Sequence, residues 1–109
     1  MLVFDGHNDV LSRLWCAGGD PVLRFARDEG HISVPAARAG GFGGGLFALY
    51  SPQARRAFDF RGFRGGTMPL STPMEQGAAL QSVMAEVGIA GRLQAAGLIR
   101  LCTEVAGIE

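Results

Sequence analysis

Three ionisable side chains near the start of the chain stand at every second position: Asp5, His7 and Asp9. In extended backbone, residues i and i+2 point to the same side, so the three side chains share one face if the extended conformation continues through Asp9. An imidazole nitrogen and a carboxylate oxygen placed in this way can chelate one divalent ion. Zinc suits such mixed nitrogen and oxygen ligation, and manganese or cobalt are chemically reasonable substitutes.

An ordinary turn is the alternative interpretation of the same stretch. Gly6 and Asn8 are common turn residues, and Asn8 or Asp9 can simply cap a following helix. The context strengthens the case for the metal site without deciding between the two, because an apolar strand is predicted before it and a helix after it. In α/β barrels the C-terminal end of a parallel strand is where the chemistry occurs.

Other candidate residues carry weaker signals. His31 stands in a polar loop and is predicted to be a surface residue. The glycines at 40–45 precede a strand, whereas phosphate-binding loops follow a strand and open a helix. Tyr50 and Ser51 end the second predicted strand and would reach the same rim as His7. A structural role is favoured for Tyr50 over a place in a substrate pocket, and Ser51 lacks the context of a nucleophile elbow.

The elements expected to position these residues alternate between strands and helices. Strands are predicted at residues 2–6, 43–50 and 98–102, and helices at 8–17, 35–40 and 72–96, with the start of another after Thr103. The second strand is apolar throughout, which is typical of a strand covered on both faces. Residues 18–35 are otherwise predicted to be loop. Strands that alternate with helices predict a parallel sheet in an α/β fold.

Composition indicates one modest packed domain. The 109 residues are 48% hydrophobic and 18% charged, and ten basic residues balance ten acidic ones. The chain therefore has no net charge that would favour binding to nucleic acid or to an anionic membrane. The segment 51–71 interleaves arginine with phenylalanine, which can bind single-stranded nucleic acid. Without a second such patch or a net positive charge, we interpret it as a long surface loop.

Cysteine use and the N-terminus predict a cytoplasmic protein. Cys16 and Cys102 are too few and too far apart for a disulfide framework, so we expect two buried thiols in a reducing compartment. No signal peptide is visible, and no window reaches the ~18 apolar residues of a membrane helix.

Several blocks together resemble a known family. The stretch FDGHNDVLSRLW (4–15) resembles the N-terminal motif of the membrane (renal) dipeptidase family of zinc metallopeptidases, within the amidohydrolase-like barrels. Residues 30–52 are similar to the family's second block, in which a His/Asp-x-Pro segment leads into a Gly-rich turn and the second strand. IRLCTEVAGIE (99–109) resembles the stretch before the third barrel strand. The resemblance is strongest to the bacterial members.

The resemblance implies a (β/α)8 TIM barrel that carries two zinc ions and hydrolyses dipeptides through a metal-activated water. In this family the first-strand His and Asp bind one of the metals, so these roles fall on His7 and Asp9. A bridging carboxylate, further His ligands and the substrate-binding residues come from later strands, so we assign no other catalytic residue here. Homo-oligomerisation is left open.

Two departures from the family are visible. A barrel of this kind typically needs ~250 residues, so residues 1–109 are expected to be the N-terminal part of a single metallo-dependent hydrolase barrel, inactive alone and with an unpaired sheet edge. Ser33 stands where relatives commonly have Asp, which concerns packing more than catalysis. Glu109 superficially resembles the bridging carboxylate, but its position fits the preceding short helix better.

Two rival functions are kept. The first is another amidohydrolase-superfamily hydrolase that acts on a different amide or ester. The second is a truncated protein that retains the start of the barrel as a non-catalytic binding or structural module. A Gly-x-Glu-Gly segment after Glu109, followed by two His-bearing strands, would favour the enzyme, and a stop codon would favour the module.

Overall fold

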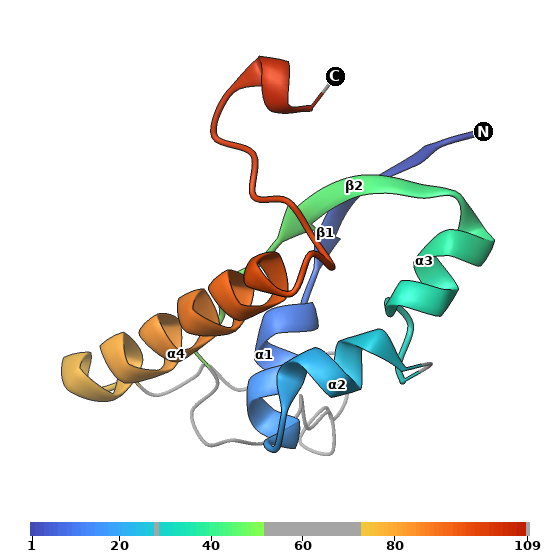
Figure 1. Cartoon of the computed structure of the whole chain (residues 1–109). Coiled ribbons are helices and arrows are strands. Elements are labelled where there is room, and N and C mark those ends of the chain that lie inside the picture. Colours follow the sequence, from blue (N-terminus) through green and yellow to red (C-terminus); the bar gives the residue numbers. More distant parts are fainter. Residues whose placement is uncertain (28, 52–72, 109) are drawn as a thin grey trace, which may run out of the picture.

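The computed structural model describes residues 1–27, 29–51 and 73–108, and Figure 1 shows its elements along the chain. Two strands and four α-helices alternate in the order expected of an α/β protein. In chain order the elements are β1 (Val3–Asn8), α1 (Val10–Ala17), α2 (Pro21–Ala26), α3 (Val34–Gly40), β2 (Phe42–Phe47), α4 (Gln76–Ala95) and a 3₁₀ helix (Val105–Gly107).

The two strands form a parallel sheet. Val3 lies opposite Phe42 and Asn8 lies opposite Phe47, so the carboxyl ends of β1 and β2 meet at the same end of the sheet. The predicted parallel pairing is therefore present. Two strands are common to many α/β folds, and the closed barrel stays a prediction.

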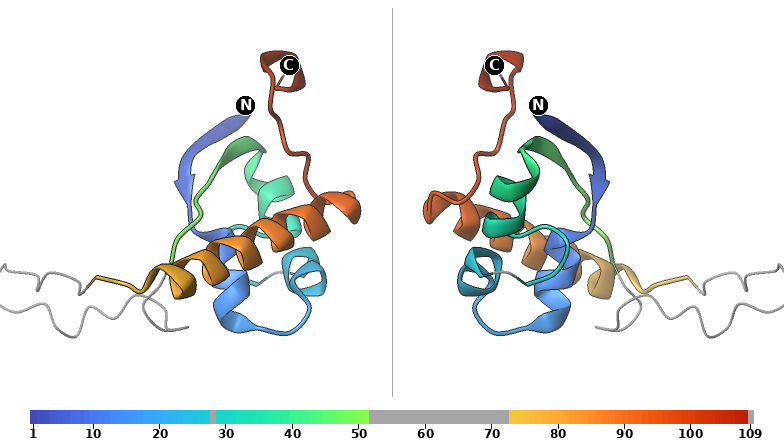
Figure 2. Two further views of the ribbon diagram at one scale, coloured as in Figure 1. Left: turned by 90° about the vertical axis from the view of Figure 1, so that its left-hand side faces the viewer. Right: turned by 90° about the vertical axis from the view of Figure 1, so that its right-hand side faces the viewer.

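A single core forms where three helices meet. α1 and α2 both pack against α4, beside the carboxyl ends of the strands (Figures 1 and 2). The buried apolar residues are Val10, Leu11, Leu14, Phe25, Ile89, Ala90 and Leu93. In both α1 and α4 the buried residues are spaced so that they lie on one face of the helix. This apolar face of each helix packs into the core.

The turn that brings β2 beside β1 depends on Gly41. This residue ends α3 in the left-handed conformation, with φ of 68°. A Cβ atom at Gly41 would lie 2.6 Å from the carbonyl oxygen of Met1, so both the backbone conformation and the close approach of the chain require glycine. The backbone of Val3 then donates a hydrogen bond to the carbonyl oxygen of Gly41 at 2.8 Å.

Large apolar side chains of the sheet face solvent in the described part of the chain. Phe4 is 59% exposed and Leu46 is 60% exposed. Of these two residues only Leu46 belongs to β2, and there the expectation of a second strand covered on both faces was wrong. The apolar composition of β2 is typical of a buried strand, whereas the described elements leave some of its side chains exposed.

Two of the predicted boundaries need correction. Residues 18–35 are not all loop, because Asp20 caps α2 by accepting a hydrogen bond from the backbone N–H of Val22, with Pro21 at the first helical position. The long helix begins at Gln76 and not at Thr72, which lies outside the described residues. Its capping side chain is Glu75, which accepts from the backbone N–H of Ala78.

The third predicted strand, at 98–102, is also wrong in this structure, since the segment has no strand partner among the described residues. Leu98 and Ile99 pack against the helical core instead. The backbone N–H of Leu101 donates to Oε1 of Gln94 at 2.8 Å. The short helix that follows is capped at Glu104, one residue after the predicted Thr103.

The described helices and the cysteines bear on the predicted compartment. None of the helices in residues 1–27, 29–51 and 73–108 is long and apolar enough to cross a lipid bilayer. Cys16 and Cys102 form no disulfide, but Cys102 is exposed and Cys16 only half-buried. The prediction of two buried thiols was therefore wrong, in the case of Cys102 because no third strand orders its segment.

Candidate metal centre

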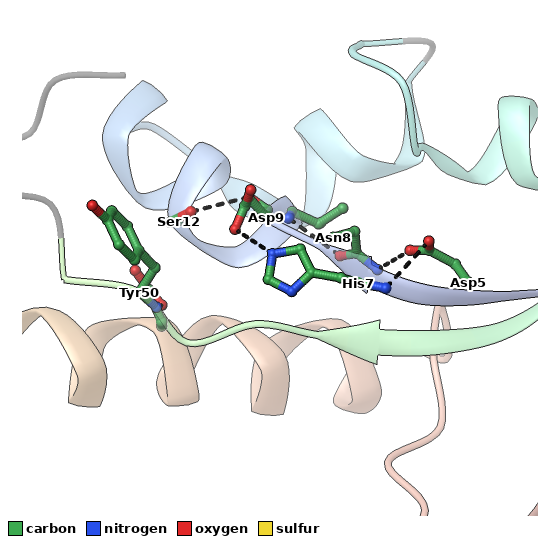
Figure 3. A network of polar contacts seen from close by, with 8 residues as sticks. Asp5, His7, Asn8, Asp9, Ser12 and Tyr50 are labelled. Carbon is green, nitrogen blue, oxygen red and sulfur yellow. Dashed lines mark hydrogen bonds and ion pairs between the residues drawn. The ribbon is translucent and has the colours of Figure 1, made fainter. Parts of the chain in front are cut away.

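His7 and Asp9, the two predicted ligands, meet at the carboxyl end of β1 (Figure 3). Nε2 of His7 lies 3.3 Å from Oδ1 of Asp9. The His7 side chain is 69% exposed and that of Asp9 is 53% exposed, so both donors remain open to solvent. An imidazole nitrogen and a carboxylate oxygen thus converge on one accessible point.

The pair does not arise from continuous extended backbone as predicted. β1 ends at Asn8, and Asp9 occupies the N-cap position of α1 with φ of −109° and ψ of 31°. The chain therefore turns into the helix at Asp9, and this turn brings its carboxylate beside the imidazole of His7. The Asp9 side chain makes no capping hydrogen bond, and its Oδ1 pairs instead with Nε2 of His7.

Asp5 and Asn8 shape the turn that holds the pair. Oδ2 of Asp5 accepts a hydrogen bond from Nδ2 of Asn8 at 2.8 Å, and its Oδ1 accepts from the backbone N–H of His7 at 3.4 Å. Oδ1 of Asn8 in turn accepts from the backbone N–H of Val10 at 3.3 Å. Asp5 therefore supports the strand end, and the turn interpretation describes the residues that position His7 and Asp9.

The end of β2 forms the adjoining part of the rim. The backbone N–H of Ala48 donates to the carbonyl oxygen of Asn8 at 2.9 Å, which extends the pairing of the strands past β2 itself. Figure 3 shows Tyr50 just beyond this point, at the same end of the sheet as His7 and Asp9. Tyr50 therefore lies at the same end of the sheet as His7, and Ser51 follows it in the chain.

Glu86 of α4 is a polar residue of this region that the sequence analysis missed. It is fully buried, and its Oε2 accepts a hydrogen bond from the backbone N–H of Tyr50 at 2.8 Å. Burial raises the pKa of the Glu86 carboxyl, the hydrogen bond from Tyr50 opposes this, and the charge of Asp9 raises the pKa further. A sequence signal was present, since Glu86 shares its helix face with Ser82, Ile89 and Leu93.

The other sequence candidates lie away from this pair or outside the described residues. His31 is an exposed residue of the loop before α3, as predicted. Ser33 is fully buried and caps α3, with its Oγ accepting from the backbone N–H of Ala36 at 3.3 Å, which is the structural role expected of it. Glu109 and residues 52–72, which include most of the Arg- and Phe-rich segment, are not described.

The donor chemistry fits half of a zinc site. Zinc accepts imidazole nitrogen and carboxylate oxygen, and a catalytic zinc normally takes three protein ligands and a water. Within the described residues, no group of three or more His, Cys, Asp and Glu side chains could hold a metal ion. His7 and Asp9 offer two donor groups, so a catalytic zinc site on this rim would require further ones.

Comparisons with known proteins give one relative without a stated activity. No protein-family model matches the chain, and no solved structure matches it. A stretch of 53 residues is 45% identical to an Acinetobacter calcoaceticus protein described as an uncharacterized protein in the PQQ-III 3′ region. The match covers 46% of this chain and only 17% of that protein, so the chain corresponds to a small part of the length of its relative.

Proposed function

We propose that this chain is the N-terminal part of a zinc-dependent dipeptidase built on an amidohydrolase-like TIM barrel. The observation that carries the proposal is the 3.3 Å approach of Nε2 of His7 to Oδ1 of Asp9 on the open rim of a parallel sheet. The resemblance of the surrounding blocks to the membrane dipeptidase family supports it. The partial coverage of the longer Acinetobacter protein agrees with a larger polypeptide.

The roles of the chain's own residues follow from the site geometry. His7 and Asp9 would hold one of two zinc ions, which when bound supply Lewis-acid activation of a water molecule and of a peptide carbonyl. Asp5 and Asn8 keep the turn in place through their hydrogen bonds, so the two ligands stay aimed at the same point. The remaining ligands and the dipeptide-binding groups would come from segments outside residues 1–109.

The expected setting is the cytoplasm, with a small dipeptide as the substrate. The absence of a cysteine pairing agrees with a reducing compartment. Homo-oligomerisation stays open.

A zinc-dependent dipeptidase assay on the complete gene product tests the proposal. The wild-type protein is expected to hydrolyse dipeptides, to lose activity with a chelator and to regain it with zinc. His7→Ala should lower the activity more than ~100-fold, since even outer-shell partners of a metal typically contribute 10–100-fold. His31→Ala is the matched control, because it removes the other histidine of the chain from an exposed loop.

The same assay separates the two rivals. Hydrolysis of other amides or esters with no action on dipeptides would favour a different amidohydrolase-type enzyme. Full dipeptidase activity in His7→Ala would overturn the assigned site. Zinc uptake without any hydrolysis would favour the non-catalytic module.

A further inference from the structure

Glu86 is a charged side chain buried on the apolar face of a helix. It lies in α4 among Ser82, Ile89 and Leu93, all of which are buried. Burial of a carboxylate is costly unless the group is paired or hydrogen-bonded. Its presence on this face therefore needs a compensating contact.

The compensating contact is with the chain that leaves β2. Oε2 of Glu86 accepts from the backbone N–H of Tyr50 at 2.8 Å. One turn earlier on α4, the Oγ atoms of Ser82 and Ser51 are 2.5 Å apart, and Oγ of Ser51 donates to the carbonyl oxygen of Ala79 at 3.1 Å. Three successive levels of α4 thus hold residues 50 and 51. We call this set of contacts the α4 clasp.

The α4 clasp connects to the metal pair through the strands. Ala48, two residues before Tyr50, donates its backbone N–H to the carbonyl oxygen of Asn8. Asn8 lies between His7 and Asp9 in the sequence, and its side chain bonds to Asp5 and to the backbone of Val10. A path of hydrogen bonds and short backbone segments therefore runs from α4 to the turn that holds His7 and Asp9.

The second carboxyl oxygen of Glu86 differs from the first in its contacts. Oε1 is the one buried side-chain nitrogen or oxygen atom in the described part of the chain without a hydrogen-bond partner. The charge of Asp9 also acts on this carboxyl group.

We propose that Glu86 is a positioning residue for the metal site, which holds the carboxyl end of β2 in place through its hydrogen bond to Tyr50 and thereby keeps His7 and Asp9 aligned for a divalent cation. This inference rests on the proposed function for the identity of the ligand pair. It assigns to α4 a role in the site although no residue of α4 is a ligand.

Titration of the complete gene product with Mn²⁺, followed by the broadening of backbone NMR signals around His7 and Asp9, tests this proposal. Glu86→Ala should weaken Mn²⁺ binding roughly 10-fold, whereas Glu86→Gln, which keeps an acceptor for the Tyr50 N–H, should stay within about 3-fold of wild type. Hydrogen exchange of the Tyr50 amide should accelerate in Glu86→Ala and stay protected in Glu86→Gln. Glu75→Ala is the matched control on the same helix and should not change the Mn²⁺ affinity.

Each contrary result has a distinct meaning. Unchanged Mn²⁺ affinity in Glu86→Ala would overturn the positioning role while leaving the metal site intact. Equal weakening in both Glu86 variants would overturn it as well, because charge and not the Tyr50 hydrogen bond would then be responsible. Absence of Mn²⁺ broadening at His7 and Asp9 in the complete wild-type protein would instead overturn the proposed function, and the positioning role with it.

A second variant keeps the proposal testable if Glu86→Ala does not fold. Ser51→Ala removes the contacts of the clasp to Ala79 and Ser82 without touching Glu86. It should weaken Mn²⁺ binding in the same direction. An unchanged affinity in this variant would contradict a role for the clasp.

Discussion

Asp9 and Glu86 are two carboxylates at the same end of the sheet in opposite environments. Asp9 opens α1 at the rim, and its side chain is 53% exposed beside His7. Glu86 lies in the middle of α4, fully buried, with one oxygen bound to the backbone of Tyr50. The same functional group can therefore take up an external cation in the first place and only an internal donor in the second. The position of the carboxylate on its helix, at the N-cap or on the buried face, decides which of these partners it can bind.

The strongest test of this contrast is to remove the charge of the exposed acid. Asp9→Asn in the complete protein should lower zinc-dependent dipeptidase activity more than ~100-fold, since a ligand should matter more than its outer-shell partners. Asp20→Asn is a suitable control, because Asp20 like Asp9 occupies the N-cap position of a helix and asparagine is equally acceptable there. Similar losses in both variants would mean that the loss at Asp9 reflects its place at the start of a helix and not a ligand role.

Burial itself can be tested with two leucines of α4. Leu93 is fully buried and Leu80 is 60% exposed. Leu93→Ala should reduce the free energy of unfolding by about 2–5 kcal/mol, and Leu80→Ala by no more than about 0.5 kcal/mol, as measured by urea denaturation. Equal effects would show that the outer face of α4 is also covered in solution, for instance by a second copy of the chain.

The smallest effects concern the pH dependence of stability, where two glutamates of the same chain segment should act in opposite directions. Burial raises the pKa of Glu86, so the folded state holds its proton more tightly and its contribution to stability is lost as pH rises through the folded-state pKa. Hydrogen bonds from the backbone N–H groups of Gly77 and Ala78 lower the pKa of Glu75, so its contribution is lost as pH falls through the folded-state pKa.

Glutamine variants at the two positions measure these contributions. Relative to wild type, Glu86→Gln should gain stability as pH rises above the ordinary glutamate pKa of about 4.3. Glu75→Gln should lose stability over the rise to neutral pH and match wild type in acid. Urea denaturation at several pH values gives both differences. A difference of the same sign for both variants would contradict the two environments described.

Local signals predicted many of the elements but not their packing. The apolar run at 2–6, the glycines at 18 and 19 and the glycine at 97 marked β1 and the ends of α1 and α4 within a few residues. The cap at Asp20 with Pro21 is an equally local signal for α2, although residues 18–35 were predicted to be loop. The prediction of a strand at 98–102 was wrong for another reason. A β-strand exists only when it pairs with another strand, and the neighbours of this segment in the described chain are helices.

For the candidate site, too, local signals predicted some features and the packing of the chain decided others. The types and spacing of His7 and Asp9 made them candidate ligands, and the resemblance of the surrounding blocks to a zinc metallopeptidase family favoured them over an ordinary turn. The end of β1 at Asn8, which places the Asp9 carboxylate beside the imidazole, depends on where the chain turns into α1 and could not be derived from alternation alone.

The sequence by itself determined the donor atoms, their order and the alternation of strands and helices, because these depend on side-chain chemistry and short-range backbone preferences. Only the tertiary structure decided that Glu86 faces the end of β2, since Tyr50 and Glu86 are 36 residues apart and their contact exists only when α4 packs against the core. The hydrogen bond between them is nonlocal, and no pattern in either segment specifies its partner.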